Sequence, residues 1–192
     1  MKTIKYWFLA MLLAPLGVQA ATVNVWVDPA DSGSYNIGDS FTVDIWGDWD
    51  IGHAAGGVTL EFDPSVVQVT GGEITVTTML DWSELGAVDN INGVVSPIGF
   101  INFGLEPGTY QIASVTMEAV GAGTSLLSLS NPLNPSFAWI VGYDASNQPI
   151  PLGNFNNATA GTVSVVPLPA AVWFMLSGLG FLAFRSRRSA KS

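Results

Sequence analysis

Cysteine is absent from the 192-residue chain, so neither a disulfide framework nor thiol chemistry contributes to its fold or function. The body between the termini also lacks lysine and arginine, and all fifteen Asp and Glu residues lie within it, between Asp28 and Asp144. Such a body cannot neutralise phosphates, which argues against nucleic acid and anionic lipid headgroups as partners and favours cations and basic partners. The six basic residues all lie at the termini: Lys2, Lys5, Arg185, Arg187, Arg188 and Lys191.

Groups suited to catalysis are scarce as well. The single histidine, His53, lies in a segment rich in glycine and alanine, and the chain has neither an HxxxH spacing nor a Gly-x-Ser-x-Gly motif. Without lysine or arginine, the body lacks the usual stabilisers of developing negative charge. We therefore predict that the protein is not an enzyme, and we assign no catalytic residue.

Residues 1–20 are typical of a cleavable secretory signal peptide. A basic front containing Lys2 and Lys5 precedes an apolar stretch over residues 6–16, and small residues end the segment at Ala20. The alternative, an uncleaved N-terminal anchor, is disfavoured because the apolar stretch is short and contains Pro15. We expect export through the Sec translocon and cleavage by signal peptidase after Ala20.

The other terminus, residues 166–192, combines a proline-containing entry, a short apolar run and a basic tail. The apolar run over residues 170–184 has fifteen residues. At about 1.5 Å per residue it falls short of a hydrocarbon core of roughly 30 Å, so it would span by including the preceding prolines or by thinning the bilayer. We predict a transmembrane helix at 170–184, with the tail at 185–192 in the cytoplasm by the positive-inside rule.

The segment opens with Val166, Pro167, Leu168, Pro169, Ala170, Ala171 and Trp173, and its apolar run is followed by Arg185, Arg187 and Arg188. This C-terminal pattern resembles the PEP-CTERM sorting signal, in its VPLPA variant, of Gram-negative bacteria that have exopolysaccharide systems. The resemblance implies recognition by an exosortase and delivery of the body to the cell surface or biofilm matrix. The commoner signal has Pro-Glu-Pro where this chain has Pro-Leu-Pro. The alternative is a permanently anchored single-pass membrane protein with a periplasmic β-sandwich.

Residues 21–165 show a hydrophobic period of two, which is typical of half-buried strands. In the first such segment Val23, Val25 and Val27 alternate with more polar positions or tryptophan. Glycine, proline, asparagine and aspartate separate the segments, as in the Asp63-Pro64 turn. We predict an all-β sandwich or jelly roll of about nine strands. The predicted strands cover residues 22–28, 41–46, 58–62, 73–78, 98–103, 110–120, 125–129, 137–143 and 161–166.

The body is similar to a cohesin domain in the order of four segments, at residues 35–45, 55–69, 104–115 and 161–165. Cohesins bind dockerin modules through one sheet face, so the resemblance implies a non-enzymatic binding or assembly module. It also implies that Thr59 and Glu61 point outward on that partner face. Another envelope protein is the kind of partner that this resemblance suggests.

Three aspartates form the best candidate for a metal site in the body. Asp44, Asp48 and Asp50 lie close in sequence, and hard cations such as Ca²⁺ bind several oxygen ligands. Amide oxygens from residues 154, 156 and 157 could complete such a site. The alternative is a solvated acidic turn, because the spacing is not that of a complete EF-hand loop.

Three tryptophans suggest contact with carbohydrate. Trp26 and Trp46 fall out of phase with the apolar residues of their strands, and Trp49 follows in what the pattern predicts as a turn. Exposed aromatic rings could stack against sugar rings, which would suit a protein delivered beside exopolysaccharide. The alternative is that loops or sheet edges cover the three indoles, with their N–H groups still bonded to a partner.

Overall fold

The computed structural model describes residues 22–28, 31–50, 52–76, 83–143, 146, 148–153 and 155–167. The predicted signal peptide, transmembrane segment and basic tail therefore lie outside the described residues. Among those residues, no helix is both long enough and apolar enough to cross a bilayer.

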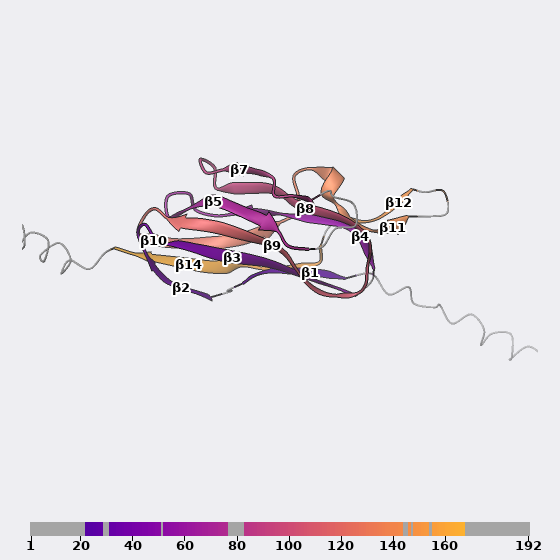
Figure 1. The fold of residues 1–192 in the computed structure, drawn as a ribbon, viewed down its shortest axis with the longest axis horizontal. Coiled ribbons are helices and arrows are strands. Elements are labelled where there is room, and N and C mark those ends of the chain that lie inside the picture. Colours follow the sequence, from indigo (N-terminus) through magenta and orange to yellow (C-terminus); the bar gives the residue numbers. More distant parts are fainter. Residues whose placement is uncertain are drawn as a thin grey trace, which may run out of the picture.

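Two β-sheets make up the described part of the body (Figure 1). The smaller sheet has five strands. Its strand order is β13-β1-β3-β9-β5. All neighbouring strands are antiparallel except β13 and β1, which are parallel. The strands are β1 (Val23–Asp28), β3 (Ser40–Trp49), β5 (Val67–Ile74), β9 (Gly108–Ala119) and β13 (Asn157–Thr159).

The larger sheet contains nine strands and includes the antiparallel pair of β4 and β8. Its main path runs in the order β12-β11-β4-β10-β14-β2, while β8 joins β4 and carries the short strands β6 and β7. These strands are β2 (Asp31–Asn36), β4 (His53–Glu61), β6 (Ser83–Glu84), β7 (Ala87–Asp89), β8 (Val94–Leu105), β10 (Gly123–Ser130), β11 (Trp139–Tyr143), β12 (Pro149–Gly153) and β14 (Gly161–Val166). The predicted all-β sandwich is confirmed.

The core follows directly from the alternation of side chains. In β1, residues Val23, Val25 and Val27 are buried while their neighbours are more exposed, because successive side chains of a strand point to opposite faces. Buried residues from both sheets form one hydrophobic cluster. Near β4, the cluster contains the fully buried Trp139, whose Nε1–H donates to the Gly57 carbonyl at 3.0 Å.

The turn after β4 forms where the sequence predicts it. Asp63 Oδ1 accepts hydrogen bonds from the Ser65 hydroxyl at 2.6 Å and from the Ser65 backbone N–H at 2.9 Å. These bonds stabilise the charged carboxylate and so hold the pKa of Asp63 below its ordinary value. Asp89 starts a similar turn with Asn92, whose side-chain and backbone hydrogen bonds lower the pKa of the Asp89 carboxyl.

The predicted strand at 73–78 is placed wrongly. The observed strand β5 starts at Val67, contains Gly71 and Gly72, and ends at Ile74. A register irregularity between Val69 and Gly71 lets β5 continue along β9 through the two glycines. The short strands β2, β6, β7, β12 and β13 were not predicted either, because they lack a run of alternating apolar residues.

Candidate functional site

The outer face of the five-stranded sheet carries two tryptophans among several carboxylates. In β3 the inner positions are Phe41, Val43, Ile45 and Trp49, so the intervening side chains point away from the core. We call this outer surface the acidic tryptophan face. Its defining residues are Trp26, Asp28, Asp44, Trp46, Asp48 and Glu73, from strands β1, β3 and β5.

One row across this face holds three carboxylates. Asp28 pairs with Asp44 across β1 and β3, Asp44 pairs with Ser114 across β3 and β9, and Ser114 pairs with Glu73 across β9 and β5. Strands lie about 4.8 Å apart, so the row extends roughly 14 Å. The Ser114 hydroxyl donates to Asp44 Oδ1 at 2.7 Å. Like charges placed directly opposite each other, as Asp28 and Asp44 are, destabilise a sheet.

The next row contains the two tryptophans. Trp26 and Trp46 are register partners across β1 and β3, and both are half-buried. The Trp46 Nε1–H is buried and has no hydrogen-bond partner among the described residues. An unbonded buried donor costs about 1–3 kcal/mol. The same face therefore carries two features that lower stability, a like-charge pair and an unbonded buried donor. Such destabilising features are expected where residues serve function rather than stability.

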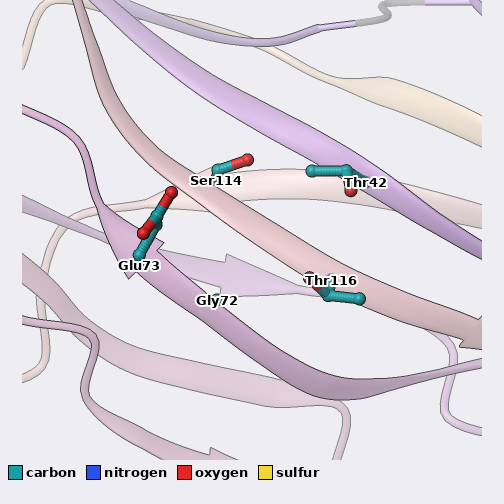
Figure 2. A pocket seen from close by; sticks show the side chains of 5 residues that line it. All are labelled: Thr42, Gly72, Glu73, Ser114 and Thr116. Atoms are coloured by element: carbon teal, nitrogen blue, oxygen red, sulfur yellow. The ribbon is translucent and has the colours of Figure 1, made fainter.

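A shallow hollow adjoins the carboxylate row (Figure 2). It has a volume of about 350 Å³ and lies over the strands β3, β9 and β5. Figure 2 shows Glu73 of β5 beside Ser114 and Thr116, two residues of β9 that line the same hollow. Because its lining is mainly polar and includes a carboxylate, it suits a polar or positively charged group better than an apolar one. The lining residues are Thr42, Gly72, Glu73, Ser114 and Thr116.

The three candidate metal ligands are not brought together. Each aspartate accepts a hydrogen bond from a different residue. Asp44 accepts from the Ser114 hydroxyl, and Asp48 Oδ1 accepts from the Thr109 hydroxyl at 2.9 Å. Asp50 Oδ1 accepts from the Thr22 N–H at 2.8 Å. Within the described part of the chain, no group of three or more His, Asp and Glu side chains is placed to hold a metal ion. The amide oxygen of Asn156 accepts from the Val23 N–H, and Asn157 donates to Asn24.

The partner face implied by Thr59 and Glu61 requires a correction. Glu61 is exposed, as expected, and accepts a hydrogen bond from the Ser130 hydroxyl at 2.7 Å. Thr59 lies on the same side of β4 as Glu61, since the intervening Leu60 belongs to the core, but Thr59 is only 1% exposed. Its hydroxyl lies 2.7 Å from the Ser96 hydroxyl and donates to the Asn131 carbonyl at 3.3 Å.

The reason is that the chain covers this part of the larger sheet itself. The segment after β10 contains a short 3-10 helix, η2 (Pro135–Phe137), and the ring of Phe137 is 2% exposed. A Cβ atom added at Gly99 would lie 2.2 Å from Phe137 Cδ1, so this glycine makes room for the ring. One added at Gly57 would lie 3.2 Å from the Cβ atom of Phe137.

Trp49 also lies elsewhere than predicted. It is 2% exposed and belongs to the core, where its ring stacks on Tyr110 with a centroid distance of 4.8 Å. Its Nε1–H donates to the Glu106 carbonyl. Of the three candidate sugar-binding tryptophans, only Trp26 and Trp46 remain on an outer face.

The other residues singled out in the sequence lie at strand ends or outside the described residues. His53 is the first residue of strand β4. Of the predicted sorting motif, the described residues include Val166, the last residue of β14, and Pro167.

Comparison with known proteins identifies solved structures that have a similar fold. No protein-family model and no curated protein sequence matches the chain. Among solved structures it is similar to the sixth cohesin of Acetivibrio cellulolyticus scaffoldin B, solved with a Cel5 dockerin, with a TM-score of 0.52 and 15% identity over 76% of this chain and 99% of that one. The body has a cohesin-like fold.

Two further structures agree with this assignment. A non-cellulosomal cohesin from the hyperthermophilic archaeon Archaeoglobus fulgidus gives a TM-score of 0.52 and 13% identity, over 80% of this chain and 97% of that chain. A type I cohesin–dockerin complex from Clostridium thermocellum, containing the OlpA cohesin, gives a TM-score of 0.54 and 11% identity, over 76% and 99%. At sequence identities this low, the similarity to cohesins establishes the fold alone.

The like-charge row predicts that removing one carboxylate stabilises the domain. We expect Asp44→Asn to raise the free energy of unfolding by about 0.2–1 kcal/mol in dilute buffer, because the amide oxygen still accepts from Ser114 while the repulsion by Asp28 is lost. The gain should shrink in 0.5 M salt, which screens exposed charges. Urea denaturation at both salt concentrations, with Glu84→Gln on β6 as the control, measures it. A destabilised Asp44→Asn variant in dilute buffer would contradict this expectation.

Proposed function

We propose that the protein is a non-enzymatic binding and assembly module of the bacterial envelope or extracellular matrix. The observation that carries the proposal is the cohesin-like sandwich with one open, chemically distinctive sheet surface, the acidic tryptophan face. Part of the opposite sheet is covered by η2 and the residues that precede it. The cohesins of Acetivibrio cellulolyticus and Clostridium thermocellum were solved with dockerins bound, which supports a protein as the partner here.

The proposal includes how the body reaches its place of action. The sequence supports export through the Sec pathway, temporary retention in the inner membrane by residues 170–184, and release by an exosortase that recognises the motif beginning at Val166. The sandwich ends close to this motif, because β14 finishes at Val166. Cleavage beyond Pro169 would therefore leave the complete sandwich on the released product.

A second candidate function is carbohydrate binding. The observation that favours it is the cross-strand pair of half-buried tryptophans, Trp26 and Trp46, on an open sheet face. Exopolysaccharide should then quench tryptophan fluorescence. Trp26→Ala or Trp46→Ala should reduce that quenching without unfolding the domain, whereas the core residue Trp49 should not be reached by the sugar.

Intact mass and fractionation of the protein from its native host test the proposed function. We expect a product that begins at residue 21, lacks the residues after about Pro169, and occurs at the cell surface or in the matrix only when exosortase is active. Mild extraction should release it as part of an assembly larger than the single chain. A full C-terminus held permanently in the inner membrane would overturn the sorting step, and a body retained in the cytoplasm would overturn the function.

A further inference from the structure

We propose that the acidic tryptophan face binds a cationic polypeptide segment, whose lysine or arginine side chains lie over Trp26 and Trp46 and between the carboxylates. This inference rests on the proposed binding function and names the surface and the chemical class of partner. It places the contact on the five-stranded sheet, away from the covered strands β4 and β8.

Charge complementarity is the first reason. The body has no lysine or arginine, so no side chain of that type within it can compensate the carboxylates of this face. Asp28, Asp44 and Glu73 share one row, and Asp48 lies four residues beyond Asp44 along β3. The carboxylates thus extend roughly 14 Å across the strands and about 13 Å along them. A partner with several separated positive charges fits this spacing.

The tryptophans are the second reason, because they indicate which kind of cation fits. The row containing Trp26 and Trp46 lies between the carboxylate row and Asp48. Lysine and arginine bind favourably over an indole ring, and nearby carboxylates strengthen the attraction. A polypeptide side chain can offer an alkyl stem to the ring and a charged head to the carboxylate in one contact.

Two other ligands fit the same face less well. A single metal ion needs several carboxylates converging on one point, and the described residues contain no such group of three. A neutral sugar can stack on Trp26 or Trp46, but it leaves the repulsion between Asp28 and Asp44 uncompensated. A basic polypeptide makes use of both the rings and the charges, and is therefore the favoured partner.

Titration of the purified full-length protein, in a non-ionic detergent, with a decalysine peptide tests the inference by calorimetry. The test variant, Asp44→Asn/Glu73→Gln, removes two carboxylates of the face. The matched control, Glu84→Gln/Glu106→Gln, removes two exposed carboxylates, one on β6 and one in the turn after β8, and leaves the same net charge. Trp46→Leu removes one ring. Circular dichroism checks that every variant is folded.

We expect the face variant to bind decalysine about tenfold more weakly than the wild type, since two exposed ion pairs together contribute roughly that factor. The control should bind within about twofold of the wild type, and Trp46→Leu should also weaken binding. Equal weakening by the face variant and the control would mean non-specific attraction and overturn the inference. Absence of decalysine binding at 20 mM salt would overturn it too, as would binding of neutral dextran alone. The location and processing of the protein in its host would still decide the proposed function separately.

Discussion

Replacing Trp139 by alanine is expected to lower the free energy of unfolding by about 3–5 kcal/mol, the range for removing a large buried aromatic residue. Trp139 is 0% exposed, and its ring lies 5.7 Å from Trp49 and 5.8 Å from Phe100 between ring centroids. Gly56 packs flat beneath it: a Cβ atom there would approach the indole to 2.4 Å. Because a whole domain is stable by only about 5–15 kcal/mol, this variant should be marginally folded. Urea denaturation measures the loss.

A conservative variant separates packing from hydrogen bonding at the same position. Trp139→Phe keeps an aromatic ring but removes the donor that bonds the Gly57 carbonyl. We expect it to be destabilised by about 1–3 kcal/mol, the cost of leaving a buried polar group unbonded, and so less than the alanine variant. Trp26→Ala, on the outer face, serves as the surface comparison and should cost less than either. A loss below 1 kcal/mol for Trp139→Ala would contradict its place in the core.

The sequence was sufficient to predict the sandwich because alternation is a local property. Val23, Val25 and Val27 specify which side of β1 faces the core without knowledge of any other strand. The same local pattern misled at Trp49. Trp49 was expected in a turn, but β3 continues to Trp49, which keeps the phase of the buried residues. Gly47 leaves room beside the ring, since a Cβ atom there would lie 3.0 Å from Trp49 Cζ3 and 2.9 Å from Ile112 Cδ1.

The candidate site could not be predicted in the same way. Trp26, Trp46, Asp44 and Asp48 were recognised individually as outward-facing or acidic residues. Their arrangement in rows depends on strand order and register, which bring Glu73 of β5 into line with Asp28 of β1 through two intervening strands. The burial of Thr59 likewise depends on residues more than seventy positions away in the chain. Alternation tells which side of a strand a residue is on, but not what covers that side.

The second prediction with a large effect on stability concerns Phe137 of η2, which covers part of β4 and β8. We expect Phe137→Ala to destabilise the domain by about 3 kcal/mol, near the lower end of the range for buried phenylalanine, because the ring lies beneath a surface segment into which water can enter. Gly99→Ala should also be destabilising, by roughly 1–3 kcal/mol, since its Cβ atom would lie 2.2 Å from Phe137 Cδ1 and force the ring to move.

The double variant tells whether these two losses have the same origin. If Phe137 is what excludes a side chain at residue 99, then Gly99→Ala should cost little once the ring is gone, and the two changes should be non-additive by at least about 1 kcal/mol. Gly71→Ala, where an added Cβ meets no atom within 4 Å, is the matched glycine control and should show no coupling to Phe137. Additive losses at residues 99 and 137 would mean that the ring does not lie on β8. Coupled losses would support the view that the chain itself covers this part of the larger sheet, so that a partner cannot reach β4 and β8 there without displacing Phe137.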